Sequence, residues 1–335
     1  MSERIILDYG SGGKASQRLI RNLFMKHFAN PGLNRMDDAA LISELQGPLS
    51  MSTDTFTVDP IFFPGGDIGS LAVHGTVNDV AMLGAIPRYI SCAFILEEGL
   101  VMGDLEKIVQ SMAGAASHAG VQIITGDTKV VPRGAVDKIF INTTGLGSVI
   151  VDPSPSGSRA VPGDAILISG SMGDHGLAIM SHRQGISFET DIQSDSQALN
   201  HLIMKLIREI DDVHVLRDPT RGGLATTLNE IAQQSNVEFV VEQSLIPIKE
   251  AVEGGCSFLG LDPLYLANEG KFICILPEKL ADKALDIMHK DPAGHEAARI
   301  GRVQDGRKGK VVLKTALGGH RLLDMLEGEQ LPRIC

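Results

Sequence analysis

The chain has 335 residues, which at about 150 residues per domain is enough for two domains, each with its own hydrophobic core. Hydrophobic residues make up 43% of the sequence and charged residues 21%, a balance that excludes a largely disordered chain. The 30 Lys and Arg residues against 41 Asp and Glu give a net charge of −11. Without a run of basic residues, this excludes an electrostatic surface for duplex nucleic acid.

The first eight residues contain no apolar run typical of a signal peptide, and nowhere do about 18 apolar residues follow one another. The four cysteines are scattered and form no C-x-x-C pair, which argues against disulfides and a structural zinc site. We therefore expect a protein of the reducing cytoplasm that does not enter a membrane. Cys92, Cys256 and Cys274 lie in apolar segments and should be buried, whereas Cys335 ends the chain.

Short β-rich segments and amphipathic helices share the first half of the chain. A glycine-rich arm at 10–14 leads into a helix, and its spacing does not match a phosphate loop. Both a flexible arm and a loop that covers phosphates remain open for it. Strands are predicted at 89–96 and 138–143. A helix is predicted between them, because five apolar residues from Leu105 to Ala116 fall on one helical face.

A stretch rich in Pro, Ser and Gly at 151–158 has no apolar period and predicts a boundary between two domains. Strands and helices mix again after it, so the pattern predicts an α+β or α/β protein. The predicted strands lie at 165–169 and 271–276, and the predicted helices at 199–210, 222–233 and 278–289.

Aspartate recurs beside small residues at five places in both halves of the chain. The five motifs are Asp37-Asp38-Ala39-Ala40, Ser52-Thr53-Asp54, Asn78-Asp79, Thr125-Gly126-Asp127-Thr128-Lys129 and Asp218-Pro219-Thr220-Arg221-Gly222-Gly223. A single Asp of this kind is more often a turn or a helix cap. Mg²⁺ bound to ATP prefers carboxylate and water oxygens, and small neighbours let a triphosphate approach. Five motifs together therefore indicate an Mg-ATP site assembled from distant segments.

These motifs resemble the ATP-binding superfamily of aminoimidazole ribonucleotide synthetase, selenophosphate synthetase and thiamine-monophosphate kinase, from about Gly10 to the C-terminus. The terminal Leu331-Pro332-Arg333-Ile334-Cys335 is similar to the tail of one family within it, the hydrogenase maturation carbamoyl dehydratases. The resemblance implies an α+β fold. An N-terminal half-barrel sheet domain at 1–152 would bind ATP and form a homodimer. A C-terminal α/β-sandwich domain at 158–325 and a flexible tail at 326–335 would follow.

In that family, the terminal thiol receives a carbamoyl group from the carbamoyltransferase HypF, and ATP drives its dehydration to a thiocyanate. The HypC–HypD iron-scaffold complex then accepts cyanide for the iron of [NiFe]-hydrogenase. The resemblance therefore implies a carbamoyl dehydratase that uses ATP and Mg²⁺. Phosphorylation turns the amide oxygen into a leaving group, and a positioned base must take the proton that nitrogen loses.

The resemblance also implies roles for single residues. The carboxylates expected to hold Mg²⁺ and the phosphates are Asp38, Asp54, Asp79, Asp127 and Asp218. Further contacts to the nucleotide are expected from Asn78, Thr128 and Arg221, although Arg221 could equally pair with a neighbouring Asp. Lys129 would neutralise charge on the transferring phosphoryl group, and Cys335 would carry the carbamoyl group. Glu269 is the candidate base, with Asp79 as a competitor. His175 is either part of the site wall or an ordinary core or surface histidine.

Two other functions remain open at this point. A small-molecule kinase or synthetase of the same superfamily would not need the tail. A non-catalytic carrier would use the tail while another protein does the chemistry. The ten residues from Leu326 to Cys335 could span up to roughly 33–36 Å, so that the thiol could reach a partner and return. The terminal carboxylate should raise the pKa of this thiol and Arg333 should lower it, and the sequence leaves the balance open.

Overall fold

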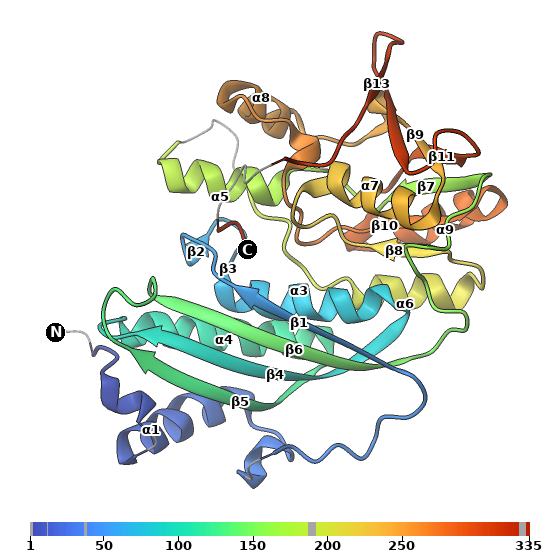
Figure 1. Cartoon of the computed structure of the whole chain (residues 1–335). Coiled ribbons are helices and arrows are strands. Elements are labelled where there is room, and N and C mark those ends of the chain that lie inside the picture. The colour runs from blue at the N-terminus through green and yellow to red at the C-terminus, as the bar shows by residue number, and fades with distance from the viewer. Residues whose placement is uncertain (1–2, 12, 37–38, 187–191, 328–332) are drawn as a thin grey trace.

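The structure is a computed structural model that describes residues 3–11, 13–36, 39–186, 192–327 and 333–335. Its described residues form two α+β units, one built on a four-stranded sheet and one on a seven-stranded sheet (Figure 1). No helix in this part of the chain is long and apolar enough to cross a membrane. The segment 151–158, which was predicted as a boundary, connects the last strand of the first sheet to the first strand of the second.

The helices and strands have the following bounds. The helices are α1 (Lys14–Leu19), α2 (Met25–Phe28), α3 (Ile68–Met82), α4 (Met102–Ala119), α5 (Asp174–Gln184), α6 (Asn200–Glu209), α7 (Gly223–Ser235), α8 (Glu250–Leu259) and α9 (Ala281–His289). The strands are β1 (Leu49–Phe56), β2 (Phe62–Phe63), β3 (Gly66–Asp67), β4 (Ala85–Glu97), β5 (Gln122–Val131), β6 (Ile139–Val149), β7 (Asp164–Ile168), β8 (Val215–Arg217), β9 (Glu238–Glu242), β10 (Ile273–Pro277), β11 (Ala298–Gln304), β12 (Lys310–Lys314) and β13 (His320–Leu322).

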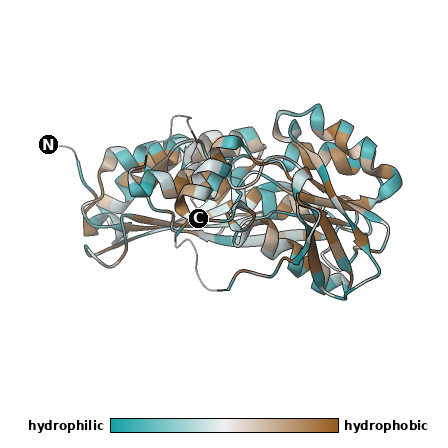
Figure 2. Cartoon of the chain, turned by 90° about the horizontal axis from the view of Figure 1, so that it is seen from above, coloured by the Kyte–Doolittle hydropathy of each residue, from teal (hydrophilic) through white to brown (hydrophobic). Residues whose placement is uncertain are grey.

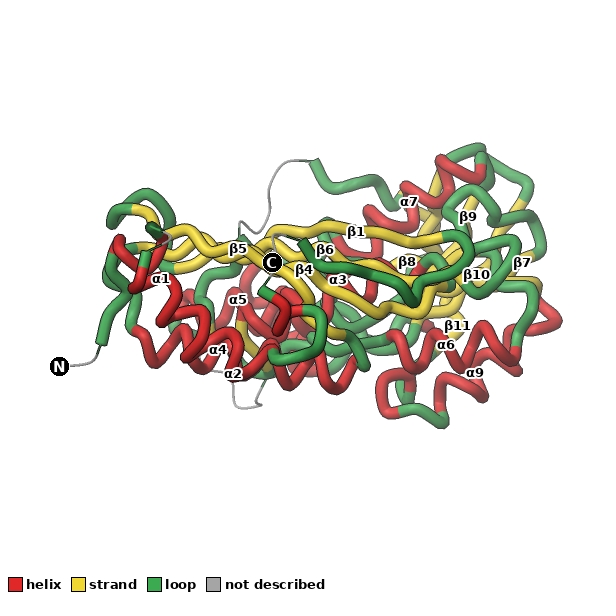
Figure 3. Tube along the Cα trace, turned by 90° about the horizontal axis from the view of Figure 1, so that it is seen from below, coloured by secondary structure: helices red, strands yellow, loops and turns green. Residues whose placement is uncertain are grey.

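The first sheet has the strand order β1-β6-β4-β5. Its pairs are antiparallel except β4 and β5, which are parallel and are joined through helix α4. Helix α4 lies along one side of the strands (Figure 3). Side chains alternate along β1, so that Ser50 and Phe56 are buried towards α3 while Leu49 and Met51 are 52% and 69% exposed on the other face. This sheet therefore has one covered face and one open face.

Helix α3 lies between the two units and contacts β1, β6 and α6. Asp67 caps its start by accepting hydrogen bonds from the backbone N–H groups of Gly69 and Ser70. Most of its residues are buried, because it is covered by the sheet on one side and by the second unit on the other. A helix that is covered on both sides has no polar face. Its sequence therefore lacks the alternation of apolar and polar residues by which a helix can be predicted.

The second sheet has the strand order β13-β12-β9-β11-β7-β10-β8. Apolar residues of α7 pack with Ile166 and Ile168 on one face, and those of α6 and α9 pack with Ala165 and Leu167 on the other. Strand β7 is buried at every position because both faces of the sheet are covered around it. Figure 2 shows this concentration of hydrophobic residues on the strands.

The elements predicted with a clear period are confirmed. Strands β4, β6, β7 and β10 contain or overlap the predicted ones, and helices α4, α6, α7 and α9 lie where helices were expected. Strands β1 and β5, which carry two of the aspartate motifs, and helix α3, which carries a third, were not predicted as elements. Cys92, Cys256 and Cys274 are buried free thiols, as expected.

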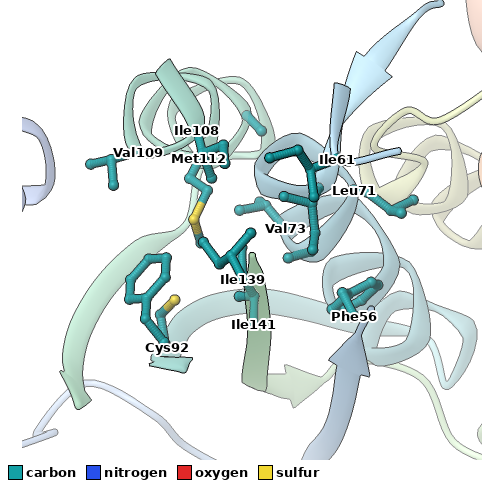
Figure 4. Packing of buried hydrophobic residues seen from close by; sticks show 14 of the residues in the cluster. Phe56, Ile61, Leu71, Val73, Cys92, Ile108, Val109, Met112, Ile139 and Ile141 are labelled. Atoms are coloured by element: carbon teal, nitrogen blue, oxygen red, sulfur yellow. The ribbon is translucent and has the colours of Figure 1, made fainter. Parts of the chain in front are cut away.

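The hydrophobic core of the first unit lies between α3, α4 and the sheet, with Phe56, Leu71, Cys92 and Met112 among its members (Figure 4). One member comes from the far end of the chain: Ile334 is only 5% exposed and belongs to this core. Figure 1 accordingly shows the C-terminus between the two units, beside β3 and α5. The end of the chain is therefore packed at the junction of the two units.

Candidate functional site

A cavity of about 510 Å³ lies where the two units meet. Its walls come from β1, α3, the segment after β8, the loop before β10 and the C-terminus. Polar side chains that line it include those of Ser52, Asp54, Asp79, Asp218, Thr220, Arg221, Glu269 and Cys335. Segments that are far apart in the sequence thus bring four carboxyl groups and the terminal thiol to one place.

Two of the four carboxyl groups come from the first unit. Asp54 lies on β1 at a position that faces α3, and Asp79 lies on α3 itself. The Ser52 hydroxyl donates a 2.6 Å hydrogen bond to Asp79 Oδ2. Gly75, which lines the same cavity, leaves room for the Phe56 ring, since a Cβ there would meet this ring at 3.0 Å. A turn or cap, which is the common role of an Asp beside small residues, is thereby excluded for Asp54 and Asp79.

The other two carboxyl groups, the half-buried Asp218 and the buried Glu269, come from the second unit. Burial raises the pKa of Asp218 to about 7, and the negative charge of Asp79 adds to this effect. Burial also raises the pKa of Glu269 well above its usual range, with further contributions from Asp218 and Asp195. These groups crowd negative charge into one cavity, so a cation bound there would be strongly favoured.

The donor set fits a magnesium ion that is shared with phosphate. No group of three or more His, Cys, Asp or Glu side chains in the described ranges could hold a metal by itself. Mg²⁺ commonly takes only one or two carboxylates from a protein and completes its octahedron with water and substrate phosphates. Asp54, Asp79 and Asp218 suit such partial coordination. Asp38, the other acidic residue expected here, lies outside the described residues.

The terminal thiol is held in the cavity by the backbone of the first unit. The Thr57 backbone N–H donates a 3.0 Å hydrogen bond to an oxygen of the Cys335 terminal carboxylate. The pKa of the Cys335 thiol is raised to about 12, mainly by burial and in part by the Glu269 carboxylate, against a lowering effect of Arg221. Arg333, which was expected to lower this pKa, instead pairs with Asp137, at 2.6 Å between Nη1 and Oδ2. The sequence left open whether the pKa of this thiol is raised or lowered; it is raised, and burial is the main cause.

Asp127, Thr128 and Lys129 lie elsewhere. They line a second cavity of about 450 Å³, together with Gly10 and Ser11 of the glycine arm. Lys129 Nζ lies 3.3 Å from Asp127 Oδ2, and both side chains are more than 60% exposed. Gly10 and Ser11 of the glycine arm thus lie at the wall of this cavity, where a loop that covers phosphates could act.

The register of the sheet shows how far this second group is from the first. Asp54 pairs with Thr143, which pairs with Cys92, which in turn pairs with Gly126, so this row of residues shares one face. Asp127 is the next residue along β5 and therefore faces the opposite, open side. Within one chain, Asp127 and Lys129 therefore lie on the opposite edge strand and the opposite face of the sheet from Asp54, whereas Thr128 lies on that edge strand but shares the face of Asp54.

Two other predicted residues make structural contacts. Asn78 is 2% exposed, donates to the Gln197 carbonyl at 3.0 Å and accepts from the Leu199 N–H at 2.8 Å, which ties α3 to the second unit. His175 is fully buried, and its Nε2 lies 2.8 Å from the Ile334 carbonyl. It is therefore a contact of the tail rather than an ordinary core histidine. Sequence reasoning missed Thr57 and Arg183, which also contact the tail and belong to no motif.

The comparisons with known proteins agree with this geometry. The family model for the N-terminal domain of AIR synthase related proteins matches residues 36–149, and the model for their C-terminal domain matches residues 161–314. The carbamoyl dehydratase HypE of Cupriavidus necator is 52% identical over 335 residues, which is 100% of this chain and 95% of that protein. The chain belongs to the HypE family of carbamoyl dehydratases.

Solved structures of this family have the same fold. A crystal structure of the hydrogenase maturation protein HypE in complex with ATP has a TM-score of 0.96 and 66% identity, over 98% of this chain and 99% of that one. A chain in a crystal structure of a HypE–HypF complex has a TM-score of 0.81 and 48% identity, over 92% of this chain and 99% of that one. The predicted family, fold class and enzyme class are thus confirmed. Because the chain is a carbamoyl dehydratase of hydrogenase maturation, neither a small-molecule kinase nor a non-catalytic carrier describes it.

Proposed function

We propose that the chain converts an S-carbamoyl group on its own Cys335 into a thiocyanate with ATP, in the cavity between its two units. The observation that carries this proposal is the position of the Cys335 thiol beside four carboxyl groups. The reaction is R–S–C(=O)–NH₂ + ATP → R–S–C≡N + ADP + phosphate. The amide oxygen leaves on the phosphate, and the nitrogen loses both of its protons.

ATP and Mg²⁺ would bind at the acidic wall of this cavity. A relative with 66% identity was crystallised with ATP, which supports a nucleotide here. We propose that Asp54, Asp79 and Asp218 hold Mg²⁺ together with phosphate oxygens, and that Arg221 contacts the phosphates. The ion would supply positive charge at the transferring phosphoryl group.

Glu269 is the base that this cavity favours. It lines the same cavity as Cys335, and its raised pKa brings it towards the range in which a carboxylate accepts protons near neutral pH. Asp79, its competitor, already accepts the Ser52 hydroxyl hydrogen bond. We therefore assign to Glu269 one of the two protons that the carbamoyl nitrogen loses, the other leaving with the phosphate, and to Asp79 a binding role.

A homodimer would explain the separate position of Asp127, Thr128 and Lys129. The open face of the first sheet exposes Leu49, Met51 and other apolar side chains that a second copy would cover. We propose that two such sheets pair and that Asp127 and Lys129 of one copy reach, around the edge strand β1, the nucleotide bound near Asp54 on the covered face of the other. The site is then completed across the dimer.

Mixed dimers test this arrangement. Asp127→Asn and Glu269→Gln chains should each be inactive alone, and mixing them should restore about one quarter of the wild-type activity per site. That fraction follows because half of the dimers are mixed and each mixed dimer has one intact site. No recovery in dimers shown to have exchanged subunits would contradict a shared site.

The thiol must also leave the cavity to meet its partners. A related chain was crystallised in a HypE–HypF complex, and we propose that HypF delivers the carbamoyl group to Cys335 here as well. HypC–HypD would accept the cyanide. A thiol with a pKa of about 12 is a poor nucleophile, so loading would take place with the tail outside the cavity. The cytoplasm, where free thiols stay reduced, would be the site of these exchanges.

Intact-mass spectrometry tests the reaction directly. The chain is loaded by HypF with a carbamoyl donor, and Mg-ATP is then added or withheld. The mass should increase by one carbamoyl group and should fall by one water, at the C-terminal peptide, only when Mg-ATP is present. A carbamoyl adduct that ATP leaves unchanged would contradict the proposal, and Cys335→Ala provides the unloaded control.

A further inference from the structure

The last three residues of the chain are bound as an extended ligand would be. A main-chain oxygen of each accepts a hydrogen bond from elsewhere in the molecule. Arg183 Nη2 donates to the Arg333 carbonyl at 2.7 Å, His175 Nε2 lies 2.8 Å from the Ile334 carbonyl, and the Thr57 N–H donates to an oxygen of the Cys335 terminal carboxylate at 3.0 Å. Main-chain hydrogen bonds of this kind give affinity to strand-like peptide recognition.

Two side chains of the same three residues add sequence specificity. Ile334 is 5% exposed in the hydrophobic core of the first unit. The Arg333 guanidinium donates from Nε to the Thr57 carbonyl at 2.8 Å and lies 2.6 Å from Asp137 Oδ2. It also lies over the Phe140 ring, 5.8 Å from the ring centre. A different residue at either position would lose these contacts.

The groups that bind the tail are themselves held by other parts of the protein. A carbonyl only accepts hydrogen bonds, so His175 carries its proton on Nε2, and the Ser194 hydroxyl lies 2.8 Å from its Nδ1. Arg183 Nε donates to the Asp59 carbonyl at 2.8 Å. Neither Ser194 nor Asp59 belongs to the tail, so these two contacts of His175 and Arg183 do not require it.

We propose that Thr57, Asp59, Asp137, His175 and Arg183 form a peptide-binding groove specific for a C-terminal Arg-Ile-Cys sequence, and that the groove accepts this sequence as a separate molecule. A chain without its own last three residues would then bind such a peptide and dehydrate its S-carbamoyl form in trans. The second statement rests on the proposed function: the peptide's amide oxygen leaves on the γ-phosphate of ATP, and the product is the peptide thiocyanate.

Binding is tested first, without nucleotide. A chain that ends at residue 332 is checked for its native circular dichroism and is titrated with a fluorescent peptide that ends in Leu-Pro-Arg-Ile-Cys. We expect saturable binding, which becomes at least about fivefold weaker when the peptide's Arg is replaced by Ala or when the chain carries Asp137→Asn. In a titration with the Ala peptide, Asp137→Asn should cost little more, because the contact that it removes is already absent there. Asp104→Asn, an exposed carboxylate paired with Lys107, is the matched control and should bind normally.

Absence of saturable binding, or equal binding of a peptide with Asp in place of Ile, would contradict the proposal of a specific peptide-binding groove. The reaction is tested second, with the S-carbamoyl peptide and Mg-ATP, by the loss of one water from the peptide. If the full chain dehydrates its own tail but the shortened chain leaves the bound peptide unchanged, the activity in trans is overturned. If the full chain also leaves its own carbamoylated tail unchanged, the proposed function fails, while the groove is still judged by binding alone.

Discussion

The Ser52 hydroxyl donates a 2.6 Å hydrogen bond to Asp79 Oδ2 and thereby joins strand β1 to helix α3 at the cavity wall. The contact orients one of the proposed magnesium ligands. Ser52→Ala should weaken Mg-ATP binding about tenfold and leave the fold intact, because a hydrogen bond to a charged group contributes roughly 1.5–3 kcal/mol. Calorimetric titration measures this change. Thr55→Ala, on the open face of the same strand, should bind Mg-ATP normally, and equal effects of the two changes would contradict the assignment.

Replacement of Glu269 separates loading from dehydration. Glu269→Gln keeps the size of the side chain but removes the proposed base, so Cys335 should still be carbamoylated while dehydration slows at least about 100-fold. Single-turnover mass spectrometry follows both species. Asp79→Asn should instead weaken Mg-ATP binding. If Asp79→Asn loses dehydration at saturating Mg-ATP and Glu269→Gln does not, the two roles are reversed.

The half-buried Asp218 should make the metal-free protein less stable as the pH rises. Its pKa is raised from 3.8 to about 7, so the folded chain binds this proton more tightly than the unfolded chain does. The stability that results is fully present below about pH 4 and is lost as the pH rises through about 7, by up to about 1.4 kcal/mol per pH unit.

Urea unfolding with EDTA at several values between about pH 4.5 and about pH 6.5 measures this effect. The pKa values of Asp54, Asp67 and Glu269 are also raised, mainly by burial, so the informative quantity is the difference between the wild type and Asp218→Asn. The wild type should lose stability relative to the variant as the pH increases. Parallel curves would show that Asp218 is not held protonated in the folded state.

Release of the tail should make Cys335 reactive. Burial in the cavity raises the pKa of this thiol from 9.0 to about 12, which lowers the thiolate fraction about 1000-fold. Ile334→Asp places a charge in the hydrophobic core and should displace the tail, so that Cys335 reacts with a disulfide reagent at least about tenfold faster. Cys335→Ser in the same background should remove this fast phase, since the other three cysteines are buried. An unchanged rate would mean that Ile334 does not hold the tail.

Gly270 should be required for the position of Glu269. A Cβ on Gly270 would lie 1.8 Å from the Asp195 carbonyl, and Asp195 Oδ1 accepts a 3.0 Å hydrogen bond from the Glu269 N–H. Gly270→Ala should therefore lower the free energy of unfolding by at least about 2 kcal/mol and reduce dehydration. Gly254→Ala on α8 meets no neighbour within 4 Å and should stabilise the chain by up to about 1 kcal/mol. Thermal unfolding compares the two variants.

Much of the chemistry is visible in the sequence because it depends on local residue types. The aspartate motifs at Asp54, Asp79 and Asp218 and the terminal Cys335 were singled out individually, and the structure brings these four residues to one cavity. Helices and strands with a single buried face, such as α4 and α6, were predictable because burial on one face leaves a period in the sequence.

Tertiary structure alone decided how these residues are grouped. Helix α3 left no period because two layers cover it, and Asp127 faces away from Asp54 because strand register, which no motif records, sets the side of the sheet. The place of the tail depends on Thr57, His175 and Arg183, which lie more than 140 residues before it. The sequence by itself thus determined the reactive groups and the family, and packing between distant segments determined which groups can meet.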